Sequence, residues 1–146
     1  MILYSYIALS FIPSPKKVRK KVAEMEIIKD TPADDPLYLP KELEIVAFLG
    51  EDEVPISSDE LILRAEKLHA SLGERQWKFI LEHEKDISPK CRDHFLLFLG
   101  TIKCDQFKRL RAPVLFWGRR TQKWIGGYVW LDYKFGSNYR LLRFYK

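Results

Sequence analysis

Cations and aromatic rings are interspersed through the last 44 residues of this chain, and side chains of these two types are able to contact phosphates and stack on flat rings. Residues 103–146 contain 11 of the 20 aromatic residues and 11 of the 25 Lys and Arg residues, but only two acids. This stretch therefore carries a formal charge of +9, while the rest of the chain carries −4. Cations contact phosphates, and exposed rings stack on bases. The C-terminal region is therefore predicted to form a nucleic-acid-binding surface.

The predicted surface has two groups of side chains. The rings that would stack on bases are Trp124, Tyr128 and Trp130. The cations that would contact phosphates are Arg119, Arg120, Lys123, Lys134, Arg140 and Arg143. The segment WIGGYVWLDY lacks the spacing of the ribonucleoprotein motif. We therefore expect binding that is single-stranded or directed at the backbone, and tolerant of base sequence.

The same composition is also consistent with a structural role and with protein binding. The rings could belong to the core of an antiparallel sheet, with the charges keeping the sheet edges from pairing. Trp, Tyr and Arg are also enriched at binding hot spots, so the alternative function is a protein-interaction subunit or adaptor of a larger complex. In that case the basic region would dock an acidic protein partner, or the acidic body of a second copy of the chain.

A second basic segment lies near the N-terminus. The run PKKVRK at 15–20 resembles a monopartite nuclear localisation signal through its K-K-x-R portion. The five cations of this segment are Lys16, Lys17, Arg19, Lys20 and Lys21. The segment would be a nuclear address in a eukaryotic source or in one that infects eukaryotes. In any other source it would be a basic arm for nucleic acid or an anionic surface.

Catalytic and metal-binding motifs are missing from the sequence. No G-x-S-x-G, H-E-x-x-H or phosphate-binding glycine loop occurs. Cys91, His94 and Cys104 carry ligand-type side chains, but their spacing lacks the paired ligands of a structural zinc site. The acidic cluster at 42–53 brackets a turn, so we interpret it as a solvated loop. We therefore expect a non-enzymatic accessory protein without metal or cofactor.

Length and composition indicate one soluble domain. A chain of 146 residues with 47% apolar content is long enough to bury a sizeable core. Two cysteines are too few for a disulfide framework, which favours free thiols in a reducing, intracellular compartment. In the apolar run at 1–12 the cations come after the apolar residues, whereas a secretory signal has them before, and the run is too short to span a bilayer. It is therefore predicted to be a buried strand, and no membrane partner is expected.

Helices are predicted mainly in the middle of the chain. Ser57 followed by Glu60 is a capping-box pattern, and apolar residues at helical spacing continue to a stop at Gly73. Two further helices are predicted over 74–85 and, after Ser88-Pro89, up to about His94. Weaker signals predict a short helix over 14–29 and an extended, proline-rich connector over 30–42.

Strands are predicted mainly in the C-terminal half, with a shorter one at 43–49. The apolar patterns that predict them cover 95–104, 113–117, 123–135 and 139–145, although the run at 94–104 is also consistent with a helix lined by Cys91, Phe95, Phe98 and Ile102. Gly126-Gly127 predicts a bulge, and residues 136–138 predict a hairpin turn into the last strand. Alternation along the long strand predicts a core face made of Val129, Leu131, Tyr133 and Phe135. The opposite face would carry Tyr128, Trp130, Asp132 and Lys134.

These elements predict an α+β fold. An antiparallel sheet, built mainly from the C-terminal strands plus the N-terminal strand, would pack against two or three helices from the middle of the chain. The whole chain, 1–146, is predicted to be a single domain. Its parts would be the strand at 1–12, the basic segment and proline-rich connector at 13–42, and the main body at 43–146.

Overall fold

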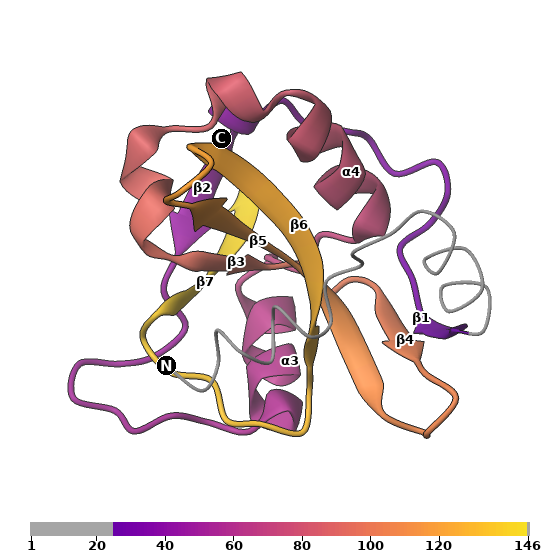
Figure 1. The fold of residues 1–146 in the computed structure, drawn as a ribbon. Coiled ribbons are helices and arrows are strands. Elements are labelled where there is room, and N and C mark those ends of the chain that lie inside the picture. Colours follow the sequence, from indigo (N-terminus) through magenta and orange to yellow (C-terminus); the bar gives the residue numbers. More distant parts are fainter. Residues whose placement is uncertain (1–24, 146) are drawn as a thin grey trace.

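A curled, mixed sheet of seven strands and two α-helices make up the part of the chain that the computed structural model describes, residues 25–145 (Figure 1). The strands are β1 (Glu26–Lys29), β2 (Leu43–Val46), β3 (Phe95–Leu97), β4 (Ile102–Cys104), β5 (Leu110–Gly118), β6 (Lys123–Trp130) and β7 (Tyr139–Phe144). The helices are α3 (Ser58–Lys67) and α4 (Glu74–Glu82), with short 3₁₀ helices η1 (Pro40–Glu42), η2 (Glu84–Asp86) and η3 (Pro89–Asp93). The α+β prediction is confirmed, while the predicted strand at 1–12 and the basic segment lie outside the described residues.

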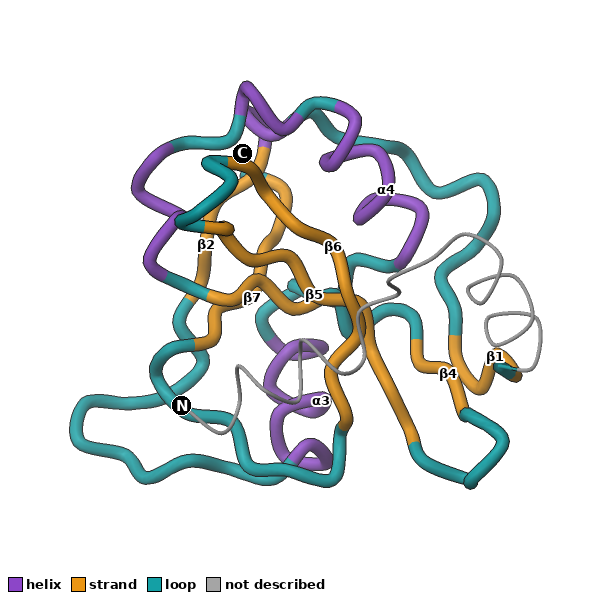
Figure 2. Tube along the Cα trace, in the orientation of Figure 1, coloured by secondary structure: helices purple, strands orange, loops and turns teal. Residues whose placement is uncertain are grey.

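β5 pairs with three other strands and lies in the middle of the sheet (Figure 2). β6 pairs with it in antiparallel fashion along one edge, while β4 and then β3 pair with it along the other. β3 also pairs with β7, which in turn pairs with β2. The β3–β7 pair is parallel, so the sheet is mostly antiparallel and not wholly so as predicted.

The predicted hairpin at 136–138 is wrong, because β7 pairs with β2 and β3 and not with β6. The long strand predicted over 123–135 ends at Trp130. Beyond it, the backbone of Phe135 exchanges two hydrogen bonds with Ile56, of 2.8 and 3.1 Å. This bridge lies between β6 and β7 in the chain. β6 pairs with one edge of β5, whereas β7 lies beyond the other edge, next to β3.

Both faces of the sheet are buried. On one face, Leu61 and Ala65 of α3 belong to a core cluster with Val129 and other strand residues. On the other face, α4 contributes Trp77 and Ile80 to a second cluster, which includes Tyr128. Neighbours along a strand point to opposite faces, so a strand between two helical layers is apolar at successive positions. The predicted core face is confirmed for Val129, Leu131 and Phe135, while Tyr133 is half-buried. On the opposite face Tyr128 is also core, whereas Asp132 and Lys134 are exposed.

The start of α3 agrees with the prediction, and its end does not. The Ser57 hydroxyl accepts a hydrogen bond of 3.3 Å from the Glu60 amide, as expected of a helix cap. The helix ends at Lys67, where His69 takes a left-handed conformation with φ of 56°. Gly73, predicted to end this helix, instead lies immediately before α4 as its N-cap residue.

Gly126 allows α4 to pack closely on β6 and forms no bulge. The β5–β6 pairing runs without a shift from the pair Arg111–Trp130 to the pair Gly118–Lys123. A Cβ atom on Gly126 would lie 2.7 Å from Leu81 Cδ1. The glycine signal therefore reports a close approach between a helix and a strand.

The segments before β2 and between α4 and β5 agree with the predictions only in part. The short helix predicted up to about His94 is present as η3, but residues 95–104, predicted as one strand, form two, β3 and β4. The connector at 30–42 has no regular helix or strand apart from η1, and it contains a turn in which the Asp35 amide donates to the carbonyl of Pro32. The helix predicted over 14–29 is wrong for residues 26–29, which form β1 along β4, and its start lies outside the described residues.

Candidate nucleic-acid interface

Two of the three predicted stacking rings lie in the core. Trp124 is 4% exposed and Tyr128 is 5% exposed, because α4 covers this face of β6. The Tyr128 ring centroid lies 5.4 Å from that of Trp77 on α4. A base cannot reach either ring without displacing the helix, so we leave both out of the candidate surface.

Trp130, the third predicted ring, is half-buried and already in contact with other side chains. The Arg109 guanidinium lies 3.7 Å from the centre of its ring. The ring also stacks on Tyr133, with 6.3 Å between centroids. These contacts belong to the end of the β5–β6 hairpin that lies far from its turn.

Tyr128 instead takes part in a buried polar cluster that the sequence did not indicate. Its hydroxyl donates to the Glu74 carboxylate at the start of α4, and Lys103 Nζ lies 2.7 Å from Glu74 Oε1. The Lys103 side chain is 9% exposed. The cluster therefore joins α4 to β4 and β6, and the one trace of it in the sequence is a lysine within an apolar run.

The charges of this cluster are stabilised in place. Burial would raise the pKa of the Glu74 carboxyl, but hydrogen bonds from Lys103 and Tyr128, with the charges of Lys103 and Lys78, hold it below its ordinary value. Burial, together with the hydrogen bond and negative charge of Glu74, raises the pKa of Tyr128 far above its ordinary value. The tyrosine therefore stays protonated and acts as a hydrogen-bond donor, which is a structural role.

Two predicted phosphate-binding cations on β7 are engaged by other groups of the protein. Arg143 Nε lies 2.6 Å from Glu44 Oε2, and Arg143 Nη1 donates to the carbonyl of Leu68 at the end of α3. Arg140 donates to the carbonyls of Ser137 and Tyr139. Lys134 is exposed in the loop after β6 and lies apart from the turn that carries the other cations.

The structure brings Arg119, Arg120 and Lys123 together at the β5–β6 turn, where all three are exposed. Gln122 holds this turn: its amide donates to the carbonyl of Gly118 at 2.8 Å, and its side chain donates to the carbonyl of Arg119 at 2.7 Å. Gln122 itself has φ of 55°. The turn is thus ordered by its own hydrogen bonds, and its cations project from a defined backbone.

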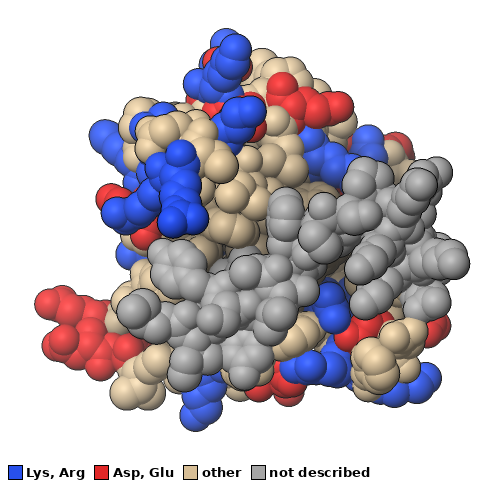
Figure 3. Space-filling model, viewed as in Figure 1, with Lys and Arg blue, Asp and Glu red and all other residues tan. Residues whose placement is uncertain are grey.

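The helix η3 packs on β5 next to this turn and carries two further cations. The guanidinium of Arg92 lies 3.9 Å from the centre of the Trp117 ring on β5, a cation–π geometry. Lys90, on the same short helix, is exposed. The basic tip, as we name it, consists of Lys90, Arg92, Arg119, Arg120 and Lys123. Figure 3 shows Lys and Arg side chains gathered over the end of the molecule where η3 and the β5–β6 turn lie.

The cations of the basic tip have no acidic partner within residues 25–145, as is also true of Lys108, Lys134 and Arg140. Within residues 25–145, the ion pairs engage other cations, among them Arg109, Arg111 and Arg143, and none includes a residue of the tip. Arg92 was missed from the sequence because only the packing of η3 on β5 brings it beside Trp117, and Lys90 was missed with it because it lies on the same short helix.

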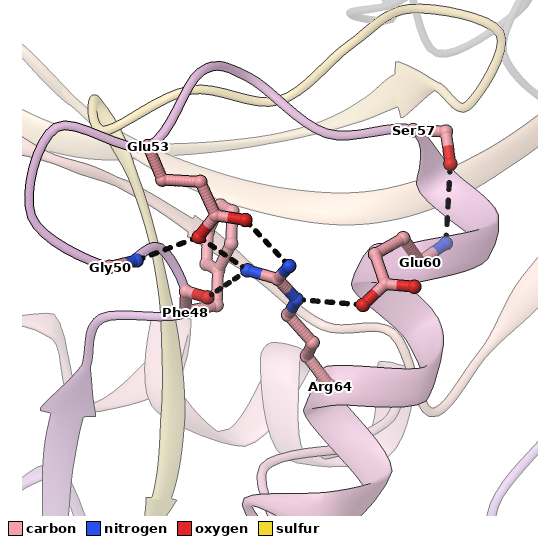
Figure 4. A network of polar contacts seen from close by, with 6 residues as sticks. All are labelled: Phe48, Gly50, Glu53, Ser57, Glu60 and Arg64. Atoms are coloured by element: carbon pink, nitrogen blue, oxygen red, sulfur yellow. Dashed lines mark hydrogen bonds and ion pairs between the residues drawn. The ribbon is translucent and has the colours of Figure 1, made fainter.

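The acidic cluster at 42–53 serves the fold. Figure 4 shows Arg64 of α3 reaching toward the loop after β2, where it makes two hydrogen bonds of 2.6 and 2.7 Å with Glu53. Arg64 also donates to the Phe48 carbonyl, and the Gly50 amide donates to Glu53. Hydrogen bonds from Arg64 and Gly50 lower the pKa of Glu53 to about 2. This carboxylate is committed to holding the loop against α3.

Other candidate chemistry has no geometric support in the described part of the chain. No group of three or more His, Cys, Asp or Glu side chains there could hold a metal ion. Cys91 and Cys104 are free thiols, and burial raises the pKa of Cys91. None of the helices between residues 25 and 145 is both long and apolar enough to cross a membrane. No protein-family model, curated protein sequence or solved structure matches this chain.

Proposed function

We propose that this protein is a non-enzymatic accessory factor that binds nucleic acid through the phosphate backbone, using the basic tip. The observation that carries the proposal is that three exposed cations share the β5–β6 turn, that η3, with Lys90 and Arg92, packs on β5 through the contact of Arg92 with Trp117, and that none of the five has an acidic partner in the described structure. Each phosphate that a cation neutralises releases counterions, and this release favours binding at low salt. Sequence-independent contacts of this kind suit an accessory role.

The test is a titration of labelled DNA and RNA oligonucleotides at two salt concentrations, followed by fluorescence anisotropy. The double variant Arg119→Gln/Arg120→Gln should bind roughly tenfold more weakly at low salt. The slope of the logarithm of its binding constant against the logarithm of the salt concentration should be shallower by about two units. The control is Lys67→Gln/Lys108→Gln, which removes the same charge from exposed positions on α3 and in the β4–β5 turn. The control should bind as the unmodified protein does.

The basic segment at 16–21 requires its own arm of this test. Replacing its five cations with Gln measures its contribution to binding without altering the tip. Binding that is unchanged in the tip variant, or weakened equally in the charge-matched control, would contradict the proposed site. No binding to any oligonucleotide at low salt would overturn the function itself.

Docking to a protein is the second candidate function, and Phe107 is the observation that favours it. This side chain is 71% exposed in the β4–β5 turn. Asp105 Oδ1 orders the turn by accepting hydrogen bonds of 2.9 and 3.0 Å from the amides of Phe107 and Arg109. An ordered, exposed ring beside cations suits a partner with an apolar pocket and an acidic rim.

Sedimentation of the purified protein tests the self-association form of this candidate. Phe107→Ser should shift a concentration-dependent dimer toward monomer. The control is Val54→Ser, which alters a side chain that is 73% exposed in the loop before α3. A protein that stays monomeric at high concentration would exclude docking between two copies of the chain.

A further inference from the structure

We infer that the basic tip takes double-stranded nucleic acid in preference to single strands, and contacts it without base stacking. This inference rests on the proposed function and adds the class of nucleic acid to it. It follows from which groups the structure places at the tip and which it keeps away from it.

The rings nearest to the tip are covered by the protein itself. Trp117 has the Arg92 guanidinium 3.9 Å from the centre of its ring and the edge of Trp124 against it, with 5.8 Å between the two indole centroids. Trp124 is buried beneath α4. The ring of Phe116, the neighbour of Trp117 on β5, packs against the core on the other face of the sheet. Trp117 is thus engaged by Arg92 and Trp124, while Trp124 and Phe116 pack into the core.

The strongly exposed rings of the described structure lie on other segments. Phe107 lies beyond the far end of β5, whose nine residues span roughly 26 Å at about 3.3 Å per residue. Tyr145 follows β7, where its amide donates to the carbonyl of Glu42. Neither ring belongs to η3 or the β5–β6 turn, so neither is part of the tip.

Single strands are bound tightly when bases stack on exposed rings, with each stack contributing about 1–3 kcal/mol. A tip that offers cations alone binds a single strand only through its phosphates, without the free energy of base stacking. A duplex has the higher charge density, with one phosphate per about 1.7 Å of axis. The binding constant therefore falls more steeply with salt: the slope of its logarithm against the logarithm of the salt concentration is about 0.9 per neutralised phosphate for a duplex and about 0.7 for a single strand. With up to five contacts, we expect a preference for the duplex of roughly tenfold at low salt.

The same cations would also attract other chains of phosphate, so the experiment has three arms. The probes are a labelled 24-base-pair duplex, an unstructured 24-nucleotide single strand and inorganic polyphosphate, compared at equal phosphate concentration. Each is titrated by anisotropy at about 50 and 150 mM salt, while tryptophan fluorescence reports stacking. The full chain is used, both unmodified and with the five cations at 16–21 replaced, so that the N-terminal segment does not mask the preference.

The expected result is roughly tenfold tighter binding of the duplex, without tryptophan quenching by the single strand. This preference should persist when residues 16–21 are neutral and should disappear in Arg119→Gln/Arg120→Gln, but not in Lys67→Gln/Lys108→Gln. Equal or tighter binding of the single strand would overturn the inference and leave the proposed function standing. Polyphosphate that binds as tightly as the duplex would overturn the selectivity. No binding to either nucleic acid would overturn both proposals.

Discussion

Arg143 Nε of β7 lies 2.6 Å from Glu44 Oε2 of β2, and this contact joins residues that are 99 positions apart. It shows that the positive charge of the C-terminal region has two uses. Some cations stabilise the fold by pairing with acids from the first 102 residues, as Lys103 does with Glu74 and Arg143 with Glu44, while the cations of the basic tip have no such partner among residues 25–145. The two groups should respond differently to substitution.

Arg143→Gln should lower stability and leave nucleic-acid binding unchanged. The variant loses the ion pair with Glu44 and the hydrogen bond to the Leu68 carbonyl, which together should cost about 1 kcal/mol. Urea denaturation followed by tryptophan fluorescence measures the loss, and anisotropy measures binding. Arg119→Gln/Arg120→Gln should show the reverse pattern. Weaker binding by a fully stable Arg143→Gln protein would place Arg143 in the interface instead.

Lys103→Met should destabilise the protein strongly, because it leaves the partly buried Glu74 carboxylate without its nearest cation. Breaking a buried pair from one side costs about 3–5 kcal/mol, so a loss of about 3 kcal/mol is expected in urea denaturation. Lys78→Met is the control, because Lys78 approaches the same carboxylate at 3.7 Å from an exposed position. It should cost less than about 0.5 kcal/mol. A further change, Glu74→Gln, should recover part of the loss in the Lys103→Met protein.

Gly126→Ala should loosen the packing of α4 on β6. The added methyl group would lie 2.7 Å from Leu81 Cδ1 and 2.9 Å from the Trp77 ring, so the helix must move. Overpacking of this kind costs about 1–3 kcal/mol, and thermal unfolding should report it as a lower Tm. Gly50→Ala is the matched control, since its methyl group would meet only Glu53 Oε1, at 3.7 Å. Equal Tm values for the two variants would contradict the close approach.

Acid should weaken the clamp between Glu53 and Arg64. The pKa of Glu53 is lowered from 4.5 to about 2 by hydrogen bonds from Arg64 and Gly50, so its contribution to stability is complete above the unfolded value. That contribution is lost as the pH falls from about 4.5 toward 2. Arg64→Met should therefore lose less stability than the unmodified protein over this range, measured by urea denaturation at successive pH values.

Arg75→Met is the control for that comparison, because Arg75 bonds only to the carbonyl of Asp35. It should retain the acid sensitivity of the unmodified protein. If Arg64→Met and the unmodified protein lost stability in parallel between pH 4.5 and 2, the clamp would not be the source of the lowered pKa.

Local signals were sufficient for most helices and strands of the described chain. The cap at Ser57, the helix beginning at Glu74 and the strand ended by Gly118 are each determined by residues within a turn or two of one another. Predictions were wrong for residues whose contacts lie far away in the sequence. Gly126 resembled a bulge because the helix that needs its small size lies about 45 residues earlier in the chain.

The sequence by itself determined the α+β composition of the chain, the apolar face with Val129 and Phe135, and the concentration of positive charge in the last third. Caps, periodicity and net charge depend on residue types and short spacings, so they can be recognised without coordinates. Only the tertiary structure decided that α4 buries Trp124 and Tyr128, and that Arg92 joins Arg119 and Arg120. Burial and charge pairing depend on contacts between segments that are distant in sequence. Such contacts form only when the sheet packs between α3 and α4.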